Sequence, residues 1–490
     1  MKRAMSLALL AALVVSTDVR PGVRAESARP AGPDWTGLRG DLRRILDQAD
    51  LDGASFGVVF IDVESGDVIF EHDADALLNP ASNAKIVTAA AALAILGPEY
   101  RFETGLYGRV NGASIDGPLF LRGRGDPTLE VEDLYALAAE LRRDGVRVIR
   151  DGIVVDSTFF DSETEPPAFD QQPGERAWFR APVGGVNVNG NVVSVSARPG
   201  STPGRPAVVT AEPEGYLDLV NDTVTTEAGA PSITFFTSGQ DGGTRARVAG
   251  SLPVSASGVR RRSRIDNPSL FAGAALREAL ESLRIRVMGD VREGTTGGQQ
   301  RLLAFHRSEP LSSVLWLLGK NSDNFTAEAL LKTMGAEGTP QGTWERGREA
   351  VGRYLASIGI APEAYRLVNG SGLFDANRFS PRQLVTILRA AWRDQTIRSE
   401  FVSQLATGGV DGTLSHRYRQ PPAFRNVRAK TGTLNDVTAL TGYVLAPPDR
   451  HTVAFSILVN GAHGRVSRGR ALQEALVTAV AEHLHASGEE

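Results

Sequence analysis

The sequence predicts an α+β protein with helices and strands at both ends of the chain and a mostly β middle. Two strand-like runs lie near the N-terminus and three lie near the C-terminus, and helical patterns accompany both groups. Between about residues 101 and 260 the chain consists of short Val- and Thr-rich runs that Gly and Pro interrupt, which is typical of β structure.

The N-terminal part predicts a helix, a hairpin and a buried helix in that order. Trp35 to Leu51 has helical periodicity. Ala54 to Val63 and Val68 to His72 are expected to be strands that a Glu-Ser-Gly-Asp turn joins. Pro80 suits a helix start, and the apolar run from Ile86 to Leu96 predicts a helix that is hidden on most sides.

The middle of the chain predicts short strands with one helix among them. The strand candidates are Leu119–Leu121, Val146–Val155 and Val192–Val195, and the helix candidate is Val131–Arg143. Residues 121–127 resemble a phosphate loop only superficially, because no helix with a Lys follows, and we expect a tight turn. The basic run from Arg260 to Arg264 indicates a solvated strand or a domain junction.

The C-terminal part predicts six helices and an antiparallel meander, and no internal repeat is apparent. The helix candidates are Asn267–Ser282, Leu311–Leu318, Phe325–Met334, Arg346–Ile358, Pro381–Trp392 and Arg470–His485. The strand candidates are Val427–Thr433, Ala439–Leu445 and Thr452–Val459.

Residues 1–25 are predicted to be a secretory signal peptide. Lys2 and Arg3 precede the apolar run Ala4–Val15, and Val23-Arg24-Ala25 offers a small-residue cleavage site. No later stretch is apolar for long enough to span a bilayer. We therefore expect a protein exported to the periplasm or cell envelope, soluble or loosely attached to the wall, without a transmembrane anchor.

Charge and cysteine content exclude several classes of function. A net charge of −4 and a pI near 6.1 provide no basic field that would attract nucleic acid. Cys is absent, which excludes disulfides, a Cys nucleophile, thiolate metal sites and a lipid-modified N-terminal Cys.

Ser82 and Lys85 form the first candidate catalytic pair. Side chains three apart on a helix are neighbours, so a hydroxyl and an amine come within hydrogen-bonding range. The chain has only five lysines among 53 cations, and Arg cannot act as a base, so a retained Lys is suspected of a role that Arg cannot fill. A neutral amine requires a pKa roughly 3–5 units below the ordinary ~10.4, which burial can provide. The alternative is that Ser82 is an N-cap and Lys85 a solvated first-turn residue.

Two further motifs lie far along the chain. Ser322-Asp323-Asn324 separates two apolar helical segments and can present a hydroxyl and an amide to a cleft, although a polar helix N-cap would look the same. Lys430-Thr431-Gly432-Thr433 lies in a strand candidate, where Gly432 allows another backbone to approach closely. The alternative for this motif is an ordinary strand end.

Ser-x-x-Lys, Ser-Asp-Asn and Lys-Thr-Gly in this order are the set described for β-lactamases and penicillin-binding proteins. The sequence resembles the serine penicillin-binding proteins, in particular the D-alanyl-D-alanine carboxypeptidase/endopeptidase family with a large insertion. Ser82 and Ser322 are 240 positions apart, and single-domain β-lactamases place these motifs much closer together. The resemblance implies a β-lactamase/transpeptidase-like domain, an antiparallel sheet covered by helices, from residues 26–100 and 261–490, which a mostly β insertion at 101–260 interrupts.

The resemblance also implies a role for each motif residue. Ser82 would attack the carbonyl between two D-alanines and form an acyl-enzyme, with Lys85 as the base for the attack. Ser322 would pass a proton towards the leaving amine, and Asn324 would hold the amine of the base and the substrate amide. The remaining residues would bind the substrate, with Lys430 near its terminal carboxylate, Thr431 and Thr433 as ligands of that carboxylate, and Gly432 giving room to the extended peptide. The backbone N–H groups of Ser82 and Thr433 would form the oxyanion hole.

Neither a cofactor nor a metal is expected. The seven His residues are scattered and none has a nucleophile-elbow Ser nearby, which argues against a Ser-His-Asp hydrolase. His483 and His485 are two positions apart on a predicted helix and do not face each other, so they do not form a metal site.

The expected function is an exported serine DD-peptidase that acts on peptidoglycan stem peptides. It would trim terminal D-alanine, and it could also cut cross-links, because both bonds are of the same type. β-Lactam antibiotics are expected to be covalent inhibitors. A β-lactamase is the alternative enzyme, disfavoured by the long insertion, and a non-catalytic wall-binding protein is the alternative from another class.

One departure from the family pattern concerns the stem peptide. Relatives commonly follow Gly-Ser-Gly-Leu with Ser-Arg, and that Arg can bind the carboxylate of a diaminopimelate side chain. Here Phe374 and Asp375 occupy these positions, and Arg378 is close enough in sequence to substitute. The hypothesis is a weaker demand for free diaminopimelate.

Overall fold

The structure, a computed structural model, describes residues 34–240 and 243–486, so the predicted signal peptide lies outside the described residues. Within these ranges no helix is long and apolar enough to cross a membrane. The α-helices are α1 (Thr36–Asp47), α2 (Ala84–Leu96), α3 (Val131–Arg143), α4 (Pro268–Ser282), α5 (Leu311–Gly319), α6 (Asn324–Ala336), α7 (Trp344–Ser357), α8 (Pro381–Arg393), α9 (Arg398–Gln404) and α10 (Val466–His485). The 3-10 turns are η1 (Ala81–Asn83), η2 (Phe169–Gln171), η3 (Trp178–Arg180), η4 (Asn189–Asn191), η5 (Pro362–Ala364) and η6 (Gly412–Leu414).

A six-stranded antiparallel sheet joins the two ends of the chain. Its order is β16 (Ala406–Thr407), β17 (Val427–Thr433), β18 (Thr438–Val444), β19 (Val453–Asn460), β1 (Ser55–Asp62) and β2 (Val68–His72). The predicted meander is β17 to β19, and β19 pairs directly with β1 along its whole length. The predicted α+β class with an antiparallel sheet between helices is confirmed.

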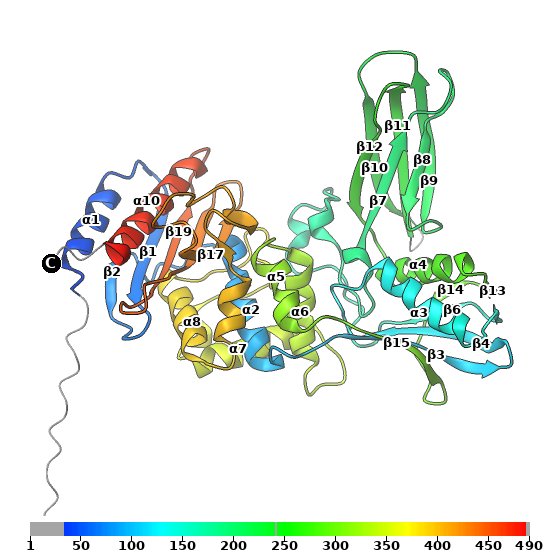
Figure 1. Cartoon of the computed structure of the whole chain (residues 1–490), viewed down its shortest axis with the longest axis horizontal. Helices are drawn as coiled ribbons and strands as arrows, with labels where there is room; N and C mark the ends of the chain where they lie inside the picture. Colours follow the sequence, from blue (N-terminus) through cyan, green and yellow to red (C-terminus); the bar gives the residue numbers. More distant parts are fainter. Residues whose placement is uncertain (1–33, 241–242, 487–490) are drawn as a thin grey trace, which may run out of the picture. The chain divides into compact units, whose positions relative to one another are not determined.

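The two faces of this sheet pack against different helices (Figure 1). Val58 and Phe60 of β1 belong to the apolar core that α1 and α10 complete, whereas the alternate residues Val59 and Ile61 belong to the core of α2 and α5 to α9. Alternation of side chains along a strand produces this division. The second core contains α2, of which ten of the 13 residues are buried, so this helix is central to the domain.

Three further sheets lie in the middle of the chain. The largest has the order β13 (Arg286–Val287), β5 (Val148–Ile149), β4 (Ser114–Gly123), β3 (Glu103–Asn111) and β15 (Arg301–Arg307), with β6 (Ile153–Asp156) on β4 and β14 (Val291–Glu293) on β6. The other two are β10 (Ser232–Gln240), β11 (Gly243–Pro253) and β9 (Leu217–Thr226), and β12 (Val259–Arg264), β7 (Val192–Arg198) and β8 (Val208–Glu212). Apolar residues of α3 and α4 contribute to the core of this region.

The pairing of β15 with β3 bears on the borders of the expected insertion. Arg307 lies opposite Glu103, and just beyond them the backbones of Phe102 and Ser308 meet, with the Ser308 N–H donating to the Phe102 carbonyl at 3.0 Å. The chain therefore enters and leaves the region at one point. We propose that the insertion extends to about residue 308, beyond the expected border at 260.

Two local expectations differ from the structure. The predicted strand Val146–Val155 is two short strands, because Gly152 has a φ of +68° and any side chain there would meet the Asp290 carbonyl. The run Arg260–Arg264 forms β12, but only its first residues are solvated. Arg264 is buried and paired with Glu165, and its N–H donates to the Arg176 carbonyl at 3.3 Å, so the segment around residues 165–176 covers this end of the strand.

Candidate active site

The first motif lies where the chain turns into α2. The Asn79 side chain accepts a hydrogen bond from the Ala81 N–H at 2.9 Å, and the turn η1 then carries Ser82 directly into the helix. Lys85 is in the first turn of α2, and its Nζ donates to Ser82 Oγ at 3.2 Å. The structure thus brings together the hydroxyl and the amine that the three-residue spacing places on one face.

The Lys85 amine is buried and has two further acceptors. Its Nζ donates to Asn324 Oδ1 at 2.8 Å and to the Ser371 carbonyl at 2.6 Å. Burial lowers the pKa of Lys85 to about 7, against the negative charges of Asp323 and Glu328, which raise it. Close to half of the amine is therefore neutral at neutral pH, so it can accept a proton from the hydroxyl beside it. The alternative of a solvated lysine is wrong.

The second motif serves both as a helix cap and as part of the site. Asp323 is the N-cap of α6, and its Oδ1 accepts a hydrogen bond from the Thr326 N–H at 2.7 Å. Ser322 precedes it with a φ of +59°, a left-handed conformation that non-glycine residues rarely adopt. Asn324 begins the helix and binds Lys85 with its oxygen, while its Nδ2 donates to the Phe179 carbonyl at 3.1 Å. The cap interpretation therefore applies to Asp323, between the two residues expected in the site.

The third motif forms the end of β17. Lys430 is buried, and burial together with the charge of Lys85 holds its pKa well below the ordinary value. Two buried amines beside each other disfavour the state in which both carry a proton. Thr431 Oγ1 donates to Thr413 Oγ1 at 2.8 Å, and Thr433 is exposed and accepts from the Arg470 guanidinium at 3.2 Å.

Another backbone approaches Gly432 closely, as the sequence predicts, and it belongs to the turn that carries Ser82. A Cβ at this position would lie 2.9 Å from the Pro80 carbonyl oxygen and 3.1 Å from the Ala81 and Ala439 Cβ atoms. Contacts this short require the neighbours to move. The glycine thus lets β17 approach the turn that carries Ser82, and this close approach brings the third motif to the first.

A cleft of about 870 Å³ connects the three motifs. Ser82, Ser322, Asn324 and Thr433 all line it. Other parts of its wall come from the segment 373–378, from residues 434–437 and from the expected insertion, through Gln171, Gln172, Glu175 and Phe179. Asn79 and Asn460 complete the lining.

Arg180 organises the part of this wall that comes from the expected insertion. It is 1% exposed, and its guanidinium donates to the carbonyls of Phe169, Gln172 and Glu175. The same group lies 5.0 Å from the ring centre of Phe374, which allows a cation–π contact. One buried cation therefore holds this segment in shape beside the loop that departs from the family pattern.

Comparison with known proteins decides the family. The model of the D-Ala-D-Ala carboxypeptidase 3 (S13) family matches residues 38–483. The chain belongs to this family. The resemblance inferred from the motifs and the expected class of enzyme are confirmed by this match.

Curated relatives and solved structures agree with this family assignment. The chain is 36% identical to a D-alanyl-D-alanine carboxypeptidase of Actinomadura sp. (strain R39) over 94% of this chain and 88% of the relative. Penicillin binding protein 4 (dacB) from Haemophilus influenzae has a similar structure, with a TM-score of 0.74, 25% identity, and coverage of 89% of this chain and 99% of that chain. The same protein complexed with a β-lactam gives a TM-score of 0.71 over 91% and 99% of the two chains, at 25% identity. The expected β-lactamase/transpeptidase-like fold is confirmed.

Asp375, one of the two positions that depart from the family pattern, contacts both Arg378 and Asn79 in the wall of the cleft. Asp375 Oδ1 contacts the Arg378 guanidinium at 2.6 Å and accepts from Asn79 Nδ2 at 3.1 Å. The hydrogen bond from Arg378 is the main reason that the pKa of Asp375 lies below its ordinary value. The charge of Arg378, the expected substitute for the missing Arg, is thus paired within the protein.

Sequence reasoning missed three groups that the structure places at the site. They are the Ser371 carbonyl, the Phe179 carbonyl and the carboxylate of Glu328. The first two are backbone carbonyls, which every residue has, so the residue type does not reveal them. The Gly-Ser-Gly-Leu pattern at residues 370–373, which relatives share, is the signal that could have indicated the first.

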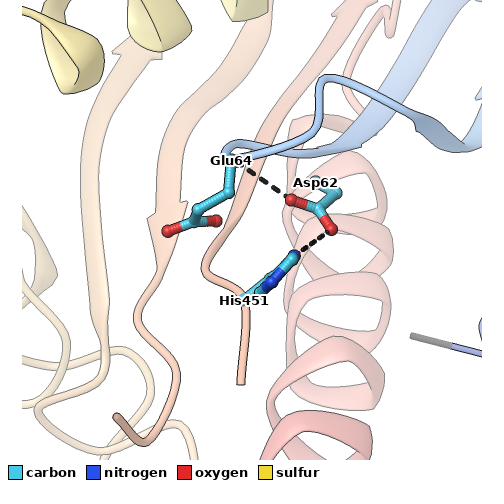
Figure 2. A group of neighbouring side chains, drawn as sticks. All are labelled: Asp62, Glu64 and His451. Atoms are coloured by element: carbon cyan, nitrogen blue, oxygen red, sulfur yellow. Dashed lines mark hydrogen bonds and ion pairs between the residues drawn. The ribbon is translucent and has the colours of Figure 1, made fainter. Parts of the chain in front are cut away.

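A separate cluster of Asp62, Glu64 and His451 lies at the turn between β1 and β2 (Figure 2). Asp62 is buried, and its Oδ1 accepts from the N–H groups of Glu64 and Ser65 at 3.0 and 3.1 Å, while its Oδ2 lies 2.6 Å from His451 Nδ1. Figure 2 shows the Glu64 carboxylate turned away from that of Asp62. Both oxygens of Asp62 have protein partners, so the contacts that hold this turn to the loop before β19 account for the cluster.

Proposed function

We propose that the chain is an exported serine DD-peptidase that cleaves the bond between two D-alanines of peptidoglycan stem peptides through an acyl-enzyme. The observation that carries the proposal is the hydrogen bond from a buried Lys85 to Ser82, which lines a cleft together with residues of the other two motifs. Membership of a D-Ala-D-Ala carboxypeptidase family supports the substrate class. Export is supported by the signal-peptide pattern of residues 1–25.

In the acylation step the neutral Lys85 amine accepts the proton of Ser82 Oγ as the oxygen attacks the carbonyl carbon. A new O–C bond forms, and the carbonyl oxygen takes negative charge, which the N–H groups of Ser82 and Thr433 would stabilise. The C–N bond then breaks, and Ser322 passes a proton to the departing D-alanine amine. Water hydrolyses the ester in the second half and regenerates the hydroxyl.

The other side chains bind and orient the substrate. Asn324 contacts the base and lines the cleft, which is where a substrate amide would meet it. Thr431 and Thr433 on β17 would bind the terminal carboxylate near the charge of Lys430, and the edge of this strand would pair with the extended peptide. The residues also fit a β-lactam, whose strained amide would acylate Ser82 in the same way.

The nature of the stem peptide follows from the Asp375–Arg378 pair. A free carboxylate on the peptide would have to displace Asp375 from Arg378 and would meet its negative charge. We therefore propose that the enzyme depends less on free diaminopimelate than its relatives do. Parallel hydrolysis of diaminopimelate- and lysine-containing peptides tests this, and a large preference for the former would refute it. Peptides with a second stem attached to the scissile amine would measure cross-link cleavage in the same experiment.

The test of the reaction is incubation of the protein and its Ser82→Ala variant with a labelled penicillin, followed by mass analysis. A stable adduct on the native protein alone is expected. Rapid release of hydrolysed penicillin would indicate a β-lactamase. If neither protein is labelled, the proposal is refuted and the wall-binding alternative gains support.

A further inference from the structure

One face of α6 carries three polar residues at intervals of four. Asn324, Glu328 and Lys332 occupy this face, and side chains four apart on a helix are neighbours. Glu328 is 1% exposed and Lys332 is fully buried. A buried charge is costly unless hydrogen bonds and opposite charges compensate it, so the partners of these residues reveal what each one holds in place.

Three N–H groups donate hydrogen bonds to the Glu328 carboxylate. Its Oε1 accepts from the Ser371 N–H at 2.8 Å, and its Oε2 accepts from the Gly370 N–H at 3.1 Å and from the Trp344 indole N–H at 3.2 Å. This set satisfies an ionised carboxylate, because a protonated one would need an acceptor as well. Burial raises the pKa of Glu328, whereas hydrogen bonds from residues 370 and 371 and the charge of Lys85 lower it and favour the anion. With these donors Glu328 fixes the backbone at residues 370 and 371 as an anion.

The same backbone carries the acceptor of the proposed base. The Ser371 carbonyl accepts from Lys85 Nζ at 2.6 Å, while the N–H of the same residue binds Glu328. From the side of α2, Thr88 Oγ1 donates to the Gly370 carbonyl at 2.8 Å. The helices α2 and α6 thus hold this segment between them. Glu328 binds the N–H of Ser371, and Lys85 binds the carbonyl of the same residue.

The charges that face Lys85 come from two elements. Asp323 and Glu328 on α6 raise its pKa, and Lys430 on β17 is the cation that repels it. Asp323 is partly exposed at the helix N-cap, whereas Glu328 is shielded from solvent. Of these two anions, Asp323 has the larger effect on the Lys85 pKa and Glu328 the second. Because a buried charge is screened less than an exposed one, removal of Glu328 should still be felt at Lys85.

We propose that Glu328 is a positioning residue for the proton transfer, which holds the Ser371 carbonyl against the Lys85 amine and supplies a buried negative charge beside it. The inference rests on the proposed role of Lys85 as the base. Glu328 itself does not line the cleft and has no contact with the substrate in this scheme.

The first test is the pH dependence of acylation by a chromogenic cephalosporin in the native protein and in Glu328→Gln. Loss of the charge lowers the pKa of Lys85, so the rise of the rate should move to lower pH by at least about half a unit. The maximal rate should fall about tenfold, because Gln has one acceptor oxygen where the carboxylate has two, so the Ser371 carbonyl is held less firmly. A lower rate with an unmoved midpoint would overturn the charge effect and leave a structural role alone.

Two further variants separate charge from shape. Glu328→Asp keeps the charge and shortens the side chain, so its midpoint should stay near the native one while its maximal rate falls. Trp344→Phe removes one donor and leaves the charge, so its profile should have the native midpoint. A midpoint that falls in either variant as far as in Glu328→Gln would contradict the proposal, and thermal unfolding of each protein controls for folding.

The second test does not depend on acylation. The chain has only five lysines, so a protein labelled with ¹³C at the lysine ε-carbon gives few NMR signals, and Lys85→Arg assigns the one of interest. The Lys85 titration should move to lower pH in Glu328→Gln. An unchanged titration in the folded variant would refute the inference about Glu328, whereas a native protein that penicillin fails to acylate would refute the proposed function instead.

Discussion

Acylation of Ser82 should rise with pH through a midpoint near neutrality. Burial lowers the pKa of Lys85 to about 7, and only its neutral form can accept the serine proton. The neutral fraction is then about 9% at pH 6 and about 91% at pH 8, so the acylation rate should increase about tenfold over this interval and level off above it. Because the pKa is lowered, acid restores the proton and activity is lost on the acidic side of the midpoint.

A lysine with its ordinary pKa would behave differently. At a pKa of ~10.4 the neutral fraction is about 0.04% at pH 7, and the rate would keep rising about tenfold per pH unit up to about pH 9. The assay is rapid-quench measurement of the labelled penicillin adduct between about pH 5.5 and about pH 9, with Lys85→Arg as the inactive control. Since Lys85 and Lys430 are coupled, the midpoint belongs to the pair. A rate that rises without a plateau would refute the assignment of a buried, partly neutral base.

Three substitutions test the contacts around the cleft. Asn324→Ala removes an acceptor of the proposed base, and loss of a hydrogen bond to a charged group, roughly 1.5–3 kcal/mol, should slow acylation about 10- to 150-fold in a stopped-flow assay. Gly432→Ala places a Cβ 2.9 Å from the Pro80 oxygen, so both the acylation rate and the thermal midpoint should fall, and unchanged values for both would contradict the close packing. Asp375→Asn releases Arg378, so the ratio of hydrolysis rates for diaminopimelate- and lysine-containing peptides should rise, and a ratio that falls would argue against the pairing.

The predictable parts of the fold and site are those that local geometry determines. The contact between Ser82 and Lys85 follows from the three-residue spacing at a helix start. The strands β18 and β19 follow from short, nearly continuous apolar runs, whose side chains point alternately into the two cores. Ser322 and Lys430 were predicted to lie in the same site because the three motifs occur in the order described for penicillin-binding proteins. Their catalytic roles stay predictions.

Other parts leave no local signal. Glu328 resembles any helical glutamate until its burial and its three donors are known, and backbone carbonyls such as that of Phe179 are independent of residue type. The strands β8 to β11 were not predicted individually, and β9 illustrates one reason, because its burial alternates weakly. The pairing of Glu103 with Arg307 is a contact across 204 positions, which no short pattern indicates.

The junction at Phe102 and Ser308 has a consequence for how such proteins can diverge. Because the two backbones meet there, the intervening segment is a loop whose ends are already closed, and changes in its length put no strain on the six-stranded sheet. Its freedom is restricted where residues 158–183 contact the domain that carries the motifs. Lys332 pairs with Asp161, the Asn369 amide donates to the Pro167 carbonyl, and the Asn324 amide donates to the Phe179 carbonyl. Selection can therefore remodel the rest of this segment as an independent accessory, whereas residues 158–183 must be inherited together with the hydrolytic machinery that they contact.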